Sequence, residues 1–264
     1  MTSRLGGTFG RLRTAGRGGL VAYVTAGDPD AERSAAVLEA VARGGADVIE
    51  VGVPFSDPLA DGPVIQRASE RALAAGMTLR GALALVRDFR KSHETPVVLF
   101  TYANPVVRMD PEVFASEARD AGVDGVLILD YPVEEAEPLR APMVAAGLDP
   151  VFLISPTTTE ERISRSGELG RGFLYVISRL GVTGTRDALA SDLEPLIARI
   201  RAHAVLPVAV GFGISRPEHV AQACRFADAA VVGSALVQEI AKHADDSDLT
   251  GRVTGYVEWL KSAL

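Results

Sequence analysis

Residues 47–66 read DVIEVGVPFSDPLADGPVIQ, a short apolar run followed by a loop rich in proline, aspartate and glycine. Side chains alternate between the two faces of a strand, so Ile49 and Val51 share one face while Val48 and Glu50 share the other. Apolar residues on both faces indicate a parallel strand that is covered on both sides. A carboxylate near the end of such a strand is costly unless it is paired or used in chemistry, which singles out Glu50.

The same kind of apolar run recurs along the chain and alternates with stretches that favour helices. Strands are expected at 20–24, 47–51, 97–101, 124–129, 150–154, 172–177, 207–210 and 229–232. Helices are expected at 29–43, 66–75, 79–91, 111–121, 133–146, 159–169, 189–203, 216–226, 235–244 and 249–262. At the start of the first of these helices, Asp28 is expected to be the N-cap and Pro29 the first helical residue.

This alternation repeats about every 25 residues without a linker, which predicts one (β/α)8 barrel, a TIM barrel, over residues 1–264. An extra helix is expected at 3–13, and the connections after the second and sixth strands are unusually long. The alternative is a doubly wound open sheet, but the glycine-rich fingerprint that such a fold carries after its first strand is missing.

Composition narrows the classes of protein. The 264 residues carry a net charge of −7, which argues against a general binder of nucleic-acid backbones. One cysteine, Cys224, excludes a disulfide scaffold, and helix packing is its expected role. The start of the chain has no long apolar run, and no stretch approaches the ~20 apolar residues of a membrane span. We therefore expect a cytoplasmic enzyme or binding protein.

Two carboxylates are the first candidates for chemistry, because barrel enzymes place their active sites where the strands end. If Ile49 and Val51 face the helices, Glu50 points into the mouth of the barrel, where apolar surroundings would raise its pKa. The alternative is a structural salt bridge to an arginine. Asp61 or Asp57, in the following loop, could fold over the same mouth, and spacing alone does not decide between them.

Glycine turns after the last two strands suggest an anion site. Residues 211–215 (GFGIS) and 233–235 (GSA) each lead towards a helix, whose N-terminus favours a phosphate. The stretch 180–185 (LGVTGT) suits a closing flap, and the amide of Gly184 could join the phosphate site. Aromatic residues near strand ends could line a pocket for a flat apolar group, although core packing explains any single one: Tyr23, Phe100, Tyr102, Tyr175 and Phe212.

Missing residue types also exclude some reactions. None of the three lysines lies at the end of a strand, which disfavours a Schiff-base aldolase. The four histidines form no metal cluster with neighbouring ligands, which disfavours a zinc-dependent aldolase. Acid–base chemistry by carboxylates on a phosphorylated substrate remains.

Residues 50–66 closely resemble the signature of the tryptophan synthase α subunit family. The stretches 23–29, 102–105, 181–184 and 211–214 are similar to further family motifs and follow in the same order. This resemblance implies a (β/α)8 barrel that cleaves indole-3-glycerol phosphate to indole and glyceraldehyde 3-phosphate. It implies that Glu50 and Asp61 are catalytic and that Asp57 lies near a subunit interface.

The resemblance also implies substrate-binding roles for a larger set of residues. Tyr175 and Thr183 would support the site. Phosphate contacts would come from Gly184, Gly213, Gly233 and Ser234. The indole pocket would involve Phe100, Tyr102 and Leu127, and further substrate contacts would come from Tyr23, Ile65 and Phe212.

A partner follows from the same resemblance. The family's β subunit uses pyridoxal phosphate to join indole to serine, so this chain would hold no cofactor. An α2β2 complex is expected, with loop 53–60 and segment 104–110 as the docking surface. Three alternatives remain: a free-standing lyase that releases indole, another phosphosugar barrel enzyme such as an isomerase, and a binding subunit that chiefly activates its partner.

Overall fold

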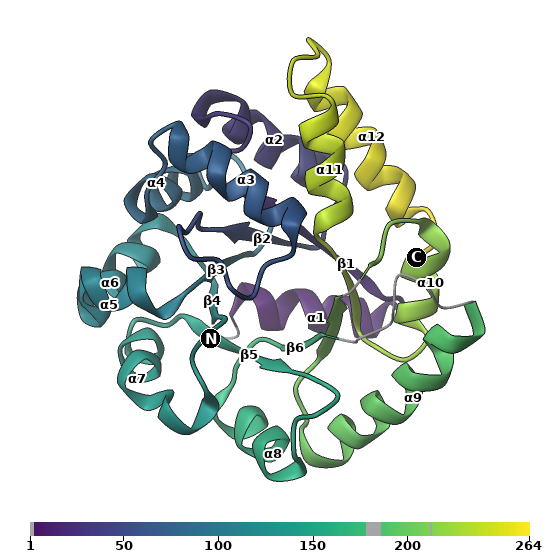
Figure 1. Cartoon of the computed structure of the whole chain (residues 1–264). Coiled ribbons are helices and arrows are strands. Elements are labelled where there is room, and N and C mark those ends of the chain that lie inside the picture. The colour runs from purple at the N-terminus through teal and green to yellow at the C-terminus, as the bar shows by residue number, and fades with distance from the viewer. Residues whose placement is uncertain (1–2, 178–185, 212) are drawn as a thin grey trace.

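Eight parallel strands close into a barrel in the computed structural model, which describes residues 3–177, 186–211 and 213–264 (Figure 1). The strands are β1 Gly19–Thr25, β2 Val48–Gly52, β3 Val97–Thr101, β4 Gly125–Ile128, β5 Asp149–Ile154, β6 Leu174–Ile177, β7 Val208–Gly211 and β8 Ala229–Val232. Each strand pairs in parallel with the next, and β8 pairs with β1. This closure confirms the predicted (β/α)8 barrel and excludes the open sheet, which would have two unpaired edges.

Helices surround the strands as an outer ring (Figure 1). They are α2 Ala31–Arg43, α3 Pro63–Ala74, α4 Leu79–Phe89, α5 Ala103–Met109, α6 Pro111–Ala121, α7 Glu137–Ala145, α8 Glu160–Leu169, α9 Arg186–His203, α10 Pro217–Cys224, α11 Ser234–Lys242 and α12 Leu249–Lys261, with a 3-10 turn η1 at Val133–Glu135. Within the described ranges, no helix combines the length and the apolar character that crossing a bilayer requires.

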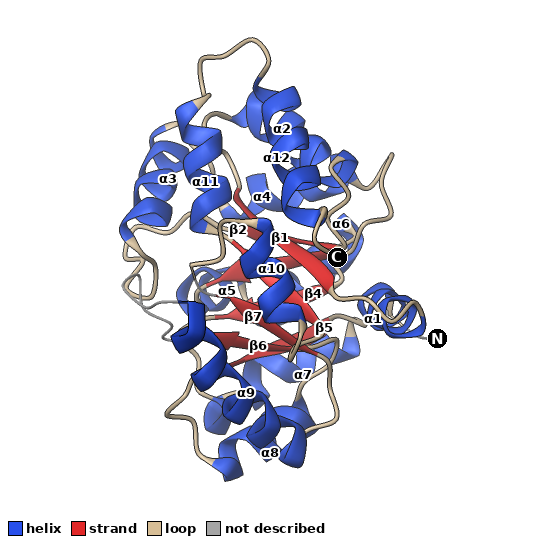
Figure 2. Ribbon diagram, turned by 90° about the vertical axis from the view of Figure 1, so that its right-hand side faces the viewer, coloured by secondary structure: helices blue, strands red, loops and turns tan. Residues whose placement is uncertain are grey.

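The predicted extra helix is α1, Arg4–Thr14, which lies at one end of the barrel (Figure 2). Its residues Leu5, Phe9 and Leu12 pack into the barrel interior, where the ring of Phe9 lies 5.4 Å from that of Phe173. Burial of such side chains stabilises the fold by about 1.5–3 kcal/mol each. The helix therefore closes one end of the barrel and leaves the carboxyl ends of the strands for the site.

Strand β2 divides its side chains as the alternation predicts. Val48 belongs to the interior cluster with Val98, whereas Ile49 and Val51 pack against the surrounding helices. All five residues of β2 are buried. Glu50 therefore lies on the inward face of the strand, two residues beyond Val48.

The predicted N-cap of α2 is wrong. Asp30, not Asp28, caps the helix, because its carboxylate accepts a hydrogen bond from the backbone N–H of Arg33. Asp28 is 2% exposed and forms a bidentate ion pair with Arg71 of α3, at 2.7 and 3.0 Å. Aspartate is a favourable N-cap residue, so both positions were suitable from the sequence. The ion pair of Asp28 with Arg71 distinguishes the two, and it depends on the tertiary structure.

Two helical regions also differ from expectation. The stretch expected as one helix at 133–146 is divided into η1 and α7, since Pro138 in the first turn of α7 cannot continue a helix from the preceding residues. Segment 103–109, for which no helix was expected, forms the short helix α5. Asp110 follows it and caps α6 through hydrogen bonds to the N–H groups of Glu112 and Val113.

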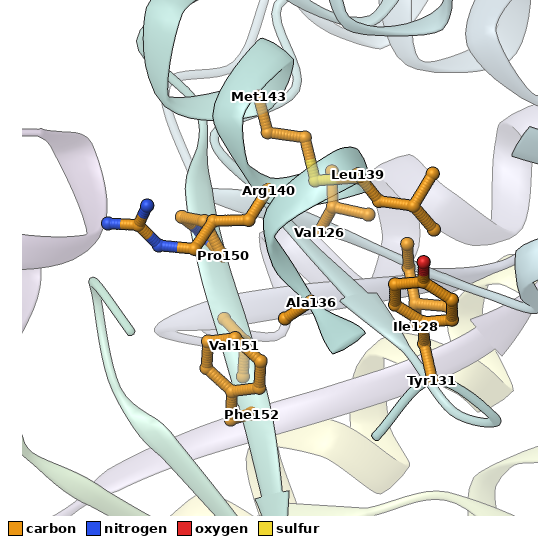
Figure 3. Close-up of a pocket in the computed structure, with 10 residues that line it drawn as sticks. All are labelled: Val126, Ile128, Tyr131, Ala136, Leu139, Arg140, Met143, Pro150, Val151 and Phe152. Atoms are coloured by element: carbon orange, nitrogen blue, oxygen red, sulfur yellow. The ribbon is translucent and has the colours of Figure 1, made fainter. Parts of the chain in front are cut away.

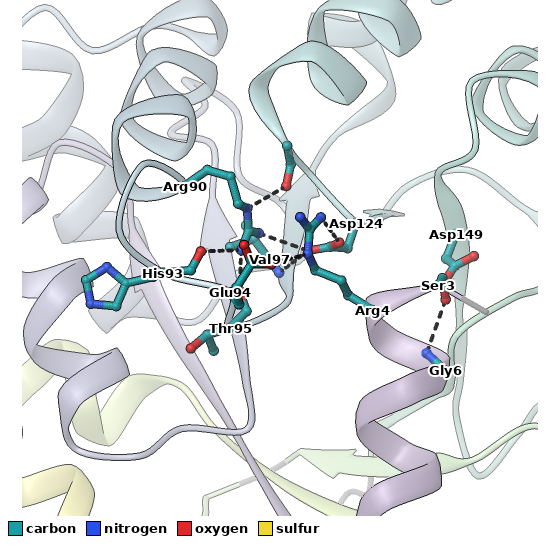
Figure 4. Close-up of polar contacts among 11 residues, drawn as sticks. Ser3, Arg4, Gly6, Arg90, His93, Glu94, Thr95, Val97, Asp124 and Asp149 are labelled. Carbon is teal, nitrogen blue, oxygen red and sulfur yellow. Dashed lines mark hydrogen bonds and ion pairs between the residues drawn. The ribbon is translucent and has the colours of Figure 1, made fainter. Parts of the chain in front are cut away.

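A charged cluster ties α1, α4 and β3 together beside the start of β4 (Figure 4). The carboxylate of Asp124 pairs with Arg90 at 2.9 Å and with Arg4 at 3.2 Å, and it accepts the backbone N–H of Val97 at 2.8 Å. Both Asp124 and Arg90 are largely buried, with side chains 5% and 11% exposed. Glu94 also pairs with Arg4, but its side chain is 82% exposed.

Asp124→Ala is expected to lower the free energy of unfolding by roughly 3 kcal/mol, because it leaves the buried Arg90 guanidinium without its carboxylate. Chemical denaturation monitored by circular dichroism measures this change. Glu94→Ala is the matched control and should cost less than about 1 kcal/mol, since its ion pair is exposed. Equal losses in the two variants would contradict the structural role assigned to Asp124.

Candidate active site

Glu50 is enclosed within β2, two residues before the strand ends at Gly52. Its side chain is 0% exposed, and neither carboxylate oxygen has a hydrogen-bond partner among the residues that the structure describes. Burial raises the pKa of Glu50 to about 8, since no positive charge or hydrogen-bond donor among the described residues favours the ionised form. The arginine salt bridge considered from the sequence is therefore not formed within the described part of the chain, and Glu50 holds a proton near neutral pH.

Asp61 lies in the loop 53–62 between β2 and α3. One of its carboxylate oxygens, Oδ2, accepts a hydrogen bond from the hydroxyl of Tyr102 at 2.9 Å. Its backbone carbonyl accepts from the side-chain amide of Gln66 at 2.8 Å, and its N–H donates to the carbonyl of Pro58 at 3.0 Å. Burial raises the pKa of Asp61, and the hydrogen bond from Tyr102 opposes this rise.

Asp57, the competitor of Asp61 in the same loop, is exposed. Its carboxylate accepts a hydrogen bond from the neighbouring Ser56 hydroxyl at 2.6 Å. The tertiary structure thus separates two aspartates that the sequence pattern left equivalent: one is partly buried against Tyr102, and the other faces solvent.

Three aromatic rings line the interior beside Glu50. The ring of Tyr23 meets that of Phe100 edge to face at 5.2 Å, and Phe100 lies 6.3 Å from Tyr175. Burial raises the pKa of both tyrosine hydroxyls, and the negative charges of Glu50 and Asp61 add to the rise. Both carboxylates therefore lie near the same two tyrosine side chains.

Two glycines make room for these tyrosines. A Cβ atom at Gly52 would lie 2.0 Å from the Tyr23 hydroxyl, and one at Gly211 would lie 2.5 Å from the Tyr175 hydroxyl. The sequence associated Gly211 with a phosphate turn and assigned nothing to Gly52. Each of these glycines lies beside a tyrosine of the neighbouring strand. This relation could be recognised only once the strand register was known.

Two further predicted contacts sit at different depths. Leu127 is 0% exposed and belongs to the interior cluster that includes Val48 and the partly buried Phe100. Ile65 lies on α3 and packs with Tyr23 and Val237. Both are next to the aromatic wall formed by Tyr23, Phe100 and Tyr175, Leu127 through Phe100 and Ile65 through Tyr23.

The predicted anion site lies where the neighbouring strands β7 and β8 end. Gly213 has φ +62, a conformation that favours glycine, and it is exposed. Gly233 is the N-cap of α11 and Ser234 its first residue, and no side chain among the described residues caps this helix end. Its backbone N–H groups are therefore suitable for an anion. Thr183, Gly184 and Phe212 lie outside the described residues.

A small cavity of about 30 Å³ lies outside the barrel wall, between β4, β5 and α7 (Figure 3). Apolar side chains such as Val126, Leu139 and Met143 line it, and the guanidinium of Arg140 points away from them. This guanidinium donates a hydrogen bond to the carbonyl of Leu169 at 2.8 Å and forms an ion pair with Glu137. The cavity's volume of about 30 Å³ is far below the roughly 300–1,000 Å³ of a typical ligand pocket, so we place no ligand site there.

Comparison with known proteins identifies one family. A family model described as tryptophan synthase alpha chain matches residues 9–261. The tryptophan synthase alpha chain of Burkholderia thailandensis is 50% identical over 263 residues, which cover 99% of this chain and 97% of that protein. The corresponding protein of Paraburkholderia phymatum is 48% identical with the same coverage.

Solved structures agree with the sequence matches. A crystal structure of tryptophan synthase subunit alpha from Legionella pneumophila has a TM-score of 0.93 at 37% identity, covering 100% of this chain and 98% of that one. A tryptophan synthase chain from M. tuberculosis, in an aminoacrylate-bound form, has a TM-score of 0.88 at 35% identity, covering 99% of each chain. The similarity therefore extends over the fold as well as the sequence.

The raised pKa of Glu50 predicts a pH-dependent stability difference between the wild-type chain and Glu50→Gln. The unfolded carboxyl has a pKa near 4.5 and the folded one near 8, so the native state keeps a proton that the unfolded state releases between these values. The wild type should therefore lose stability relative to Glu50→Gln as pH rises from 4.5 to 8. The slope is at most about 1.4 kcal/mol per pH unit.

Denaturation of both proteins across this range measures the difference, in which contributions from all other groups cancel. We expect the difference to be flat above pH 8, where Glu50 is ionised in both states. A difference that does not change with pH would show that Glu50 has an ordinary pKa.

Proposed function

The chain belongs to the tryptophan synthase alpha chain family, lyases that cleave indole-3-glycerol phosphate, and we propose that Glu50 and Asp61 carry out this cleavage in the mouth of the barrel. The main support for this proposal is that the carboxyl of Glu50 is fully buried and has no hydrogen-bond partner in the described residues. Family membership also favours cleavage over the isomerase considered from the sequence.

The reaction is a retro-aldol cleavage that requires two proton transfers. The carbon–carbon bond breaks only after carbon C3 of the indole ring is protonated, because the unprotonated ring is a poor leaving group. The adjacent glycerol hydroxyl then loses its proton as its carbonyl forms, and the electron pair of the broken bond returns to the protonated ring. The products are neutral indole and glyceraldehyde 3-phosphate.

Glu50 suits both transfers. With a pKa of about 8 it begins protonated near neutral pH, and can donate this proton to the ring carbon. The resulting carboxylate is then available to accept the hydroxyl proton, which restores the starting form. The buried surroundings make the proton easier to regain, since they disfavour the charged carboxylate.

Asp61 is proposed to accept a hydrogen bond from the indole N–H. Protonation at C3 places a positive charge on the ring, and a carboxylate held beside the nitrogen stabilises that charge as it develops. Asp61 is partly buried and its carboxylate is directed by Tyr102, which supports this role. The aromatic wall of Tyr23, Phe100 and Tyr175 would hold the flat ring between the two carboxylates.

The phosphate group is proposed to bind at the ends of β7 and β8. Support comes from the uncapped N-terminus of α11 at Gly233 and Ser234 and from the exposed turn at Gly213. Thr183 and Gly184 are proposed to complete this part of the site, as the family resemblance implies. Anchoring the phosphate lets binding energy orient the indole end relative to Glu50.

The alpha chain reaction needs no cofactor, and pyridoxal phosphate belongs to the beta subunit with which the family pairs. For this chain we propose an α2β2 complex in which indole passes directly to the beta subunit. Loop 53–60 and segment 104–110 are the proposed docking surface. Support comes from two apolar side chains on these segments, Leu59 at 94% and Val107 at 55% exposure.

Glu50→Gln is expected to lower the rate of indole release from indole-3-glycerol phosphate by about 10²- to 10⁴-fold, because the amide cannot transfer protons. Asp61→Asn should also lower the rate, since it removes the negative charge beside the ring. Indole released by the purified full chain is the quantity to measure, with circular dichroism to verify folding.

Asp57→Asn is the matched control for these two variants, because Asp57 shares the loop of Asp61 but faces solvent. Its rate in the isolated chain should stay within about twofold of the wild type. A near-normal rate of cleavage by Glu50→Gln would contradict the assignment of Glu50 as the proton donor.

Val107→Asp is expected to weaken binding of the purified beta subunit by tenfold or more, or about 1.4 kcal/mol, because it places an unpaired charge in an apolar contact. Val205→Asp is the control: Val205 is 99% exposed and lies before β7, away from the proposed surface. Titration calorimetry distinguishes the two. If the wild-type chain itself forms no complex, the free-standing indole-releasing lyase is the better description.

A further inference from the structure

Tyr102 occupies the junction between the barrel and the loop that carries Asp61. It follows directly after β3 and is the N-cap residue of α5. Its side chain is only 3% exposed, and its ring stacks on that of Phe55 with 5.0 Å between centroids and 30° between planes. The family resemblance suggested a wall of the indole pocket, but a ring covered to this degree has another use available.

The hydroxyl of Tyr102 makes two hydrogen bonds to adjacent residues of the loop. It donates to Asp61 Oδ2 at 2.9 Å and accepts from the backbone N–H of Ala60 at 3.1 Å. The first bond orients the carboxylate, and the second fixes the backbone just before it. The Tyr102 side chain therefore fixes both the backbone that precedes Asp61 and the orientation of its carboxylate.

Other contacts fix the loop backbone but not this carboxylate. The side-chain amide of Gln66 donates to the carbonyl of Asp61, and the N–H of Asp61 donates to Pro58. Within the ranges that the structure describes, the hydrogen bond from Tyr102 is the one that Asp61 Oδ2 receives from a side chain. Loss of the Tyr102 hydroxyl would thus free the carboxylate of Asp61 and the N–H of Ala60, while the hydrogen bonds with Gln66 and Pro58 still hold the backbone of Asp61.

Tyr102 is itself held on rigid structure. The preceding residue, Thr101, ends a strand of the closed barrel, and the N–H of the next residue, Ala103, donates to Asp130 Oδ1 at 2.7 Å. The N–H of Val53 at the start of the loop donates to the carbonyl of Phe100 at 2.9 Å. Tyr102 therefore transfers the stiffness of β3 to a group that a loop alone would hold loosely.

We propose that Tyr102 is a positioning residue that holds the Asp61 carboxylate in the orientation needed to stabilise the protonated indole ring. The proposal deepens the function described above and rests on the role of Asp61 in it. The same hydrogen bond favours the ionised carboxylate, because the hydroxyl donates to it. Asp61 is thus kept both directed and charged in surroundings that would otherwise favour its neutral form.

Tyr102→Phe removes the two hydrogen bonds but keeps the ring and its stacking on Phe55. We expect kcat for indole release by the full chain to fall by roughly 10- to 100-fold, with KM changed less than threefold. The loss should disappear in an Asp61→Asn background: the double variant should match Asp61→Asn alone within about threefold, since Tyr102 acts through the group already removed.

The pH profile gives an independent readout that a purely structural defect would not change in this way. Without the donated hydrogen bond the pKa of Asp61 should rise, so the acid limb of kcat/KM should move to higher pH while the alkaline limb stays in place. Thr254→Val is the matched control, because it loses one hydroxyl bond, to the carbonyl of Ala40 at 3.1 Å, far from the barrel mouth. It should leave rate and profile unchanged.

Several outcomes would overturn the proposal. A Tyr102→Phe chain with wild-type kcat and an unmoved acid limb excludes a positioning role. Losses that multiply in the double variant show that Tyr102 acts on the substrate independently of Asp61. Wild-type cleavage by Asp61→Asn alone instead contradicts the proposed function, and so separates the two failures.

Discussion

Water stabilises an ionised carboxylate, and the barrel interior offers Glu50 neither water-exposed surface nor a hydrogen-bond donor from the described residues. A group in this condition keeps its proton until about pH 8. The strands on both sides enclose it: Tyr23 of β1 and Val98 of β3 are the register partners of Glu50, and Val48 and Val98 belong to the apolar cluster of the barrel interior. The burial of Glu50 is costly, but it leaves the carboxyl protonated and able to donate its proton near neutral pH.

The second carboxylate is held in a different way. Glu50 is rigid because it belongs to a strand paired on both sides, to β1 and to β3. Asp61 sits on a loop and obtains its orientation from a hydroxyl anchored at the end of β3. The two groups also meet opposite electrostatic conditions, since nothing in the described residues offsets the burial of Glu50, whereas the Tyr102 hydrogen bond offsets part of the burial of Asp61. One is suited to carry a proton and the other to remain charged.

Stability and chemistry occupy opposite ends of the barrel. At the amino ends of the strands, α1 fills the interior and the Asp124 cluster ties helices to strands through buried ion pairs. Towards the carboxyl ends, the groups are a protonated acid and a helix N-terminus, neither of which has a side-chain partner in the described part of the chain, and glycines that leave room for tyrosines. The paired groups at the amino ends stabilise the fold, and the unpaired polar groups towards the carboxyl ends remain available to bind substrate. This division is common in (β/α)8 barrels.

The sequence alone was sufficient for whatever depends on local periodicity. Apolar runs separated by helical stretches determined the eight-unit barrel, and the two-residue period of β2 determined that Glu50 faces inward while Ile49 and Val51 face the helices. Residues 50–66 were enough to identify the family. Partners distant in the chain were decided by tertiary structure: Asp28 pairs with Arg71, Asp61 but not Asp57 meets Tyr102, and Gly52 accommodates Tyr23. Strands and helices are determined by patterns among neighbouring residues. Contacts such as those of Asp61 with Tyr102 and of Asp28 with Arg71, which are 41 and 43 positions apart, exist only after the barrel has closed and set the register of its strands.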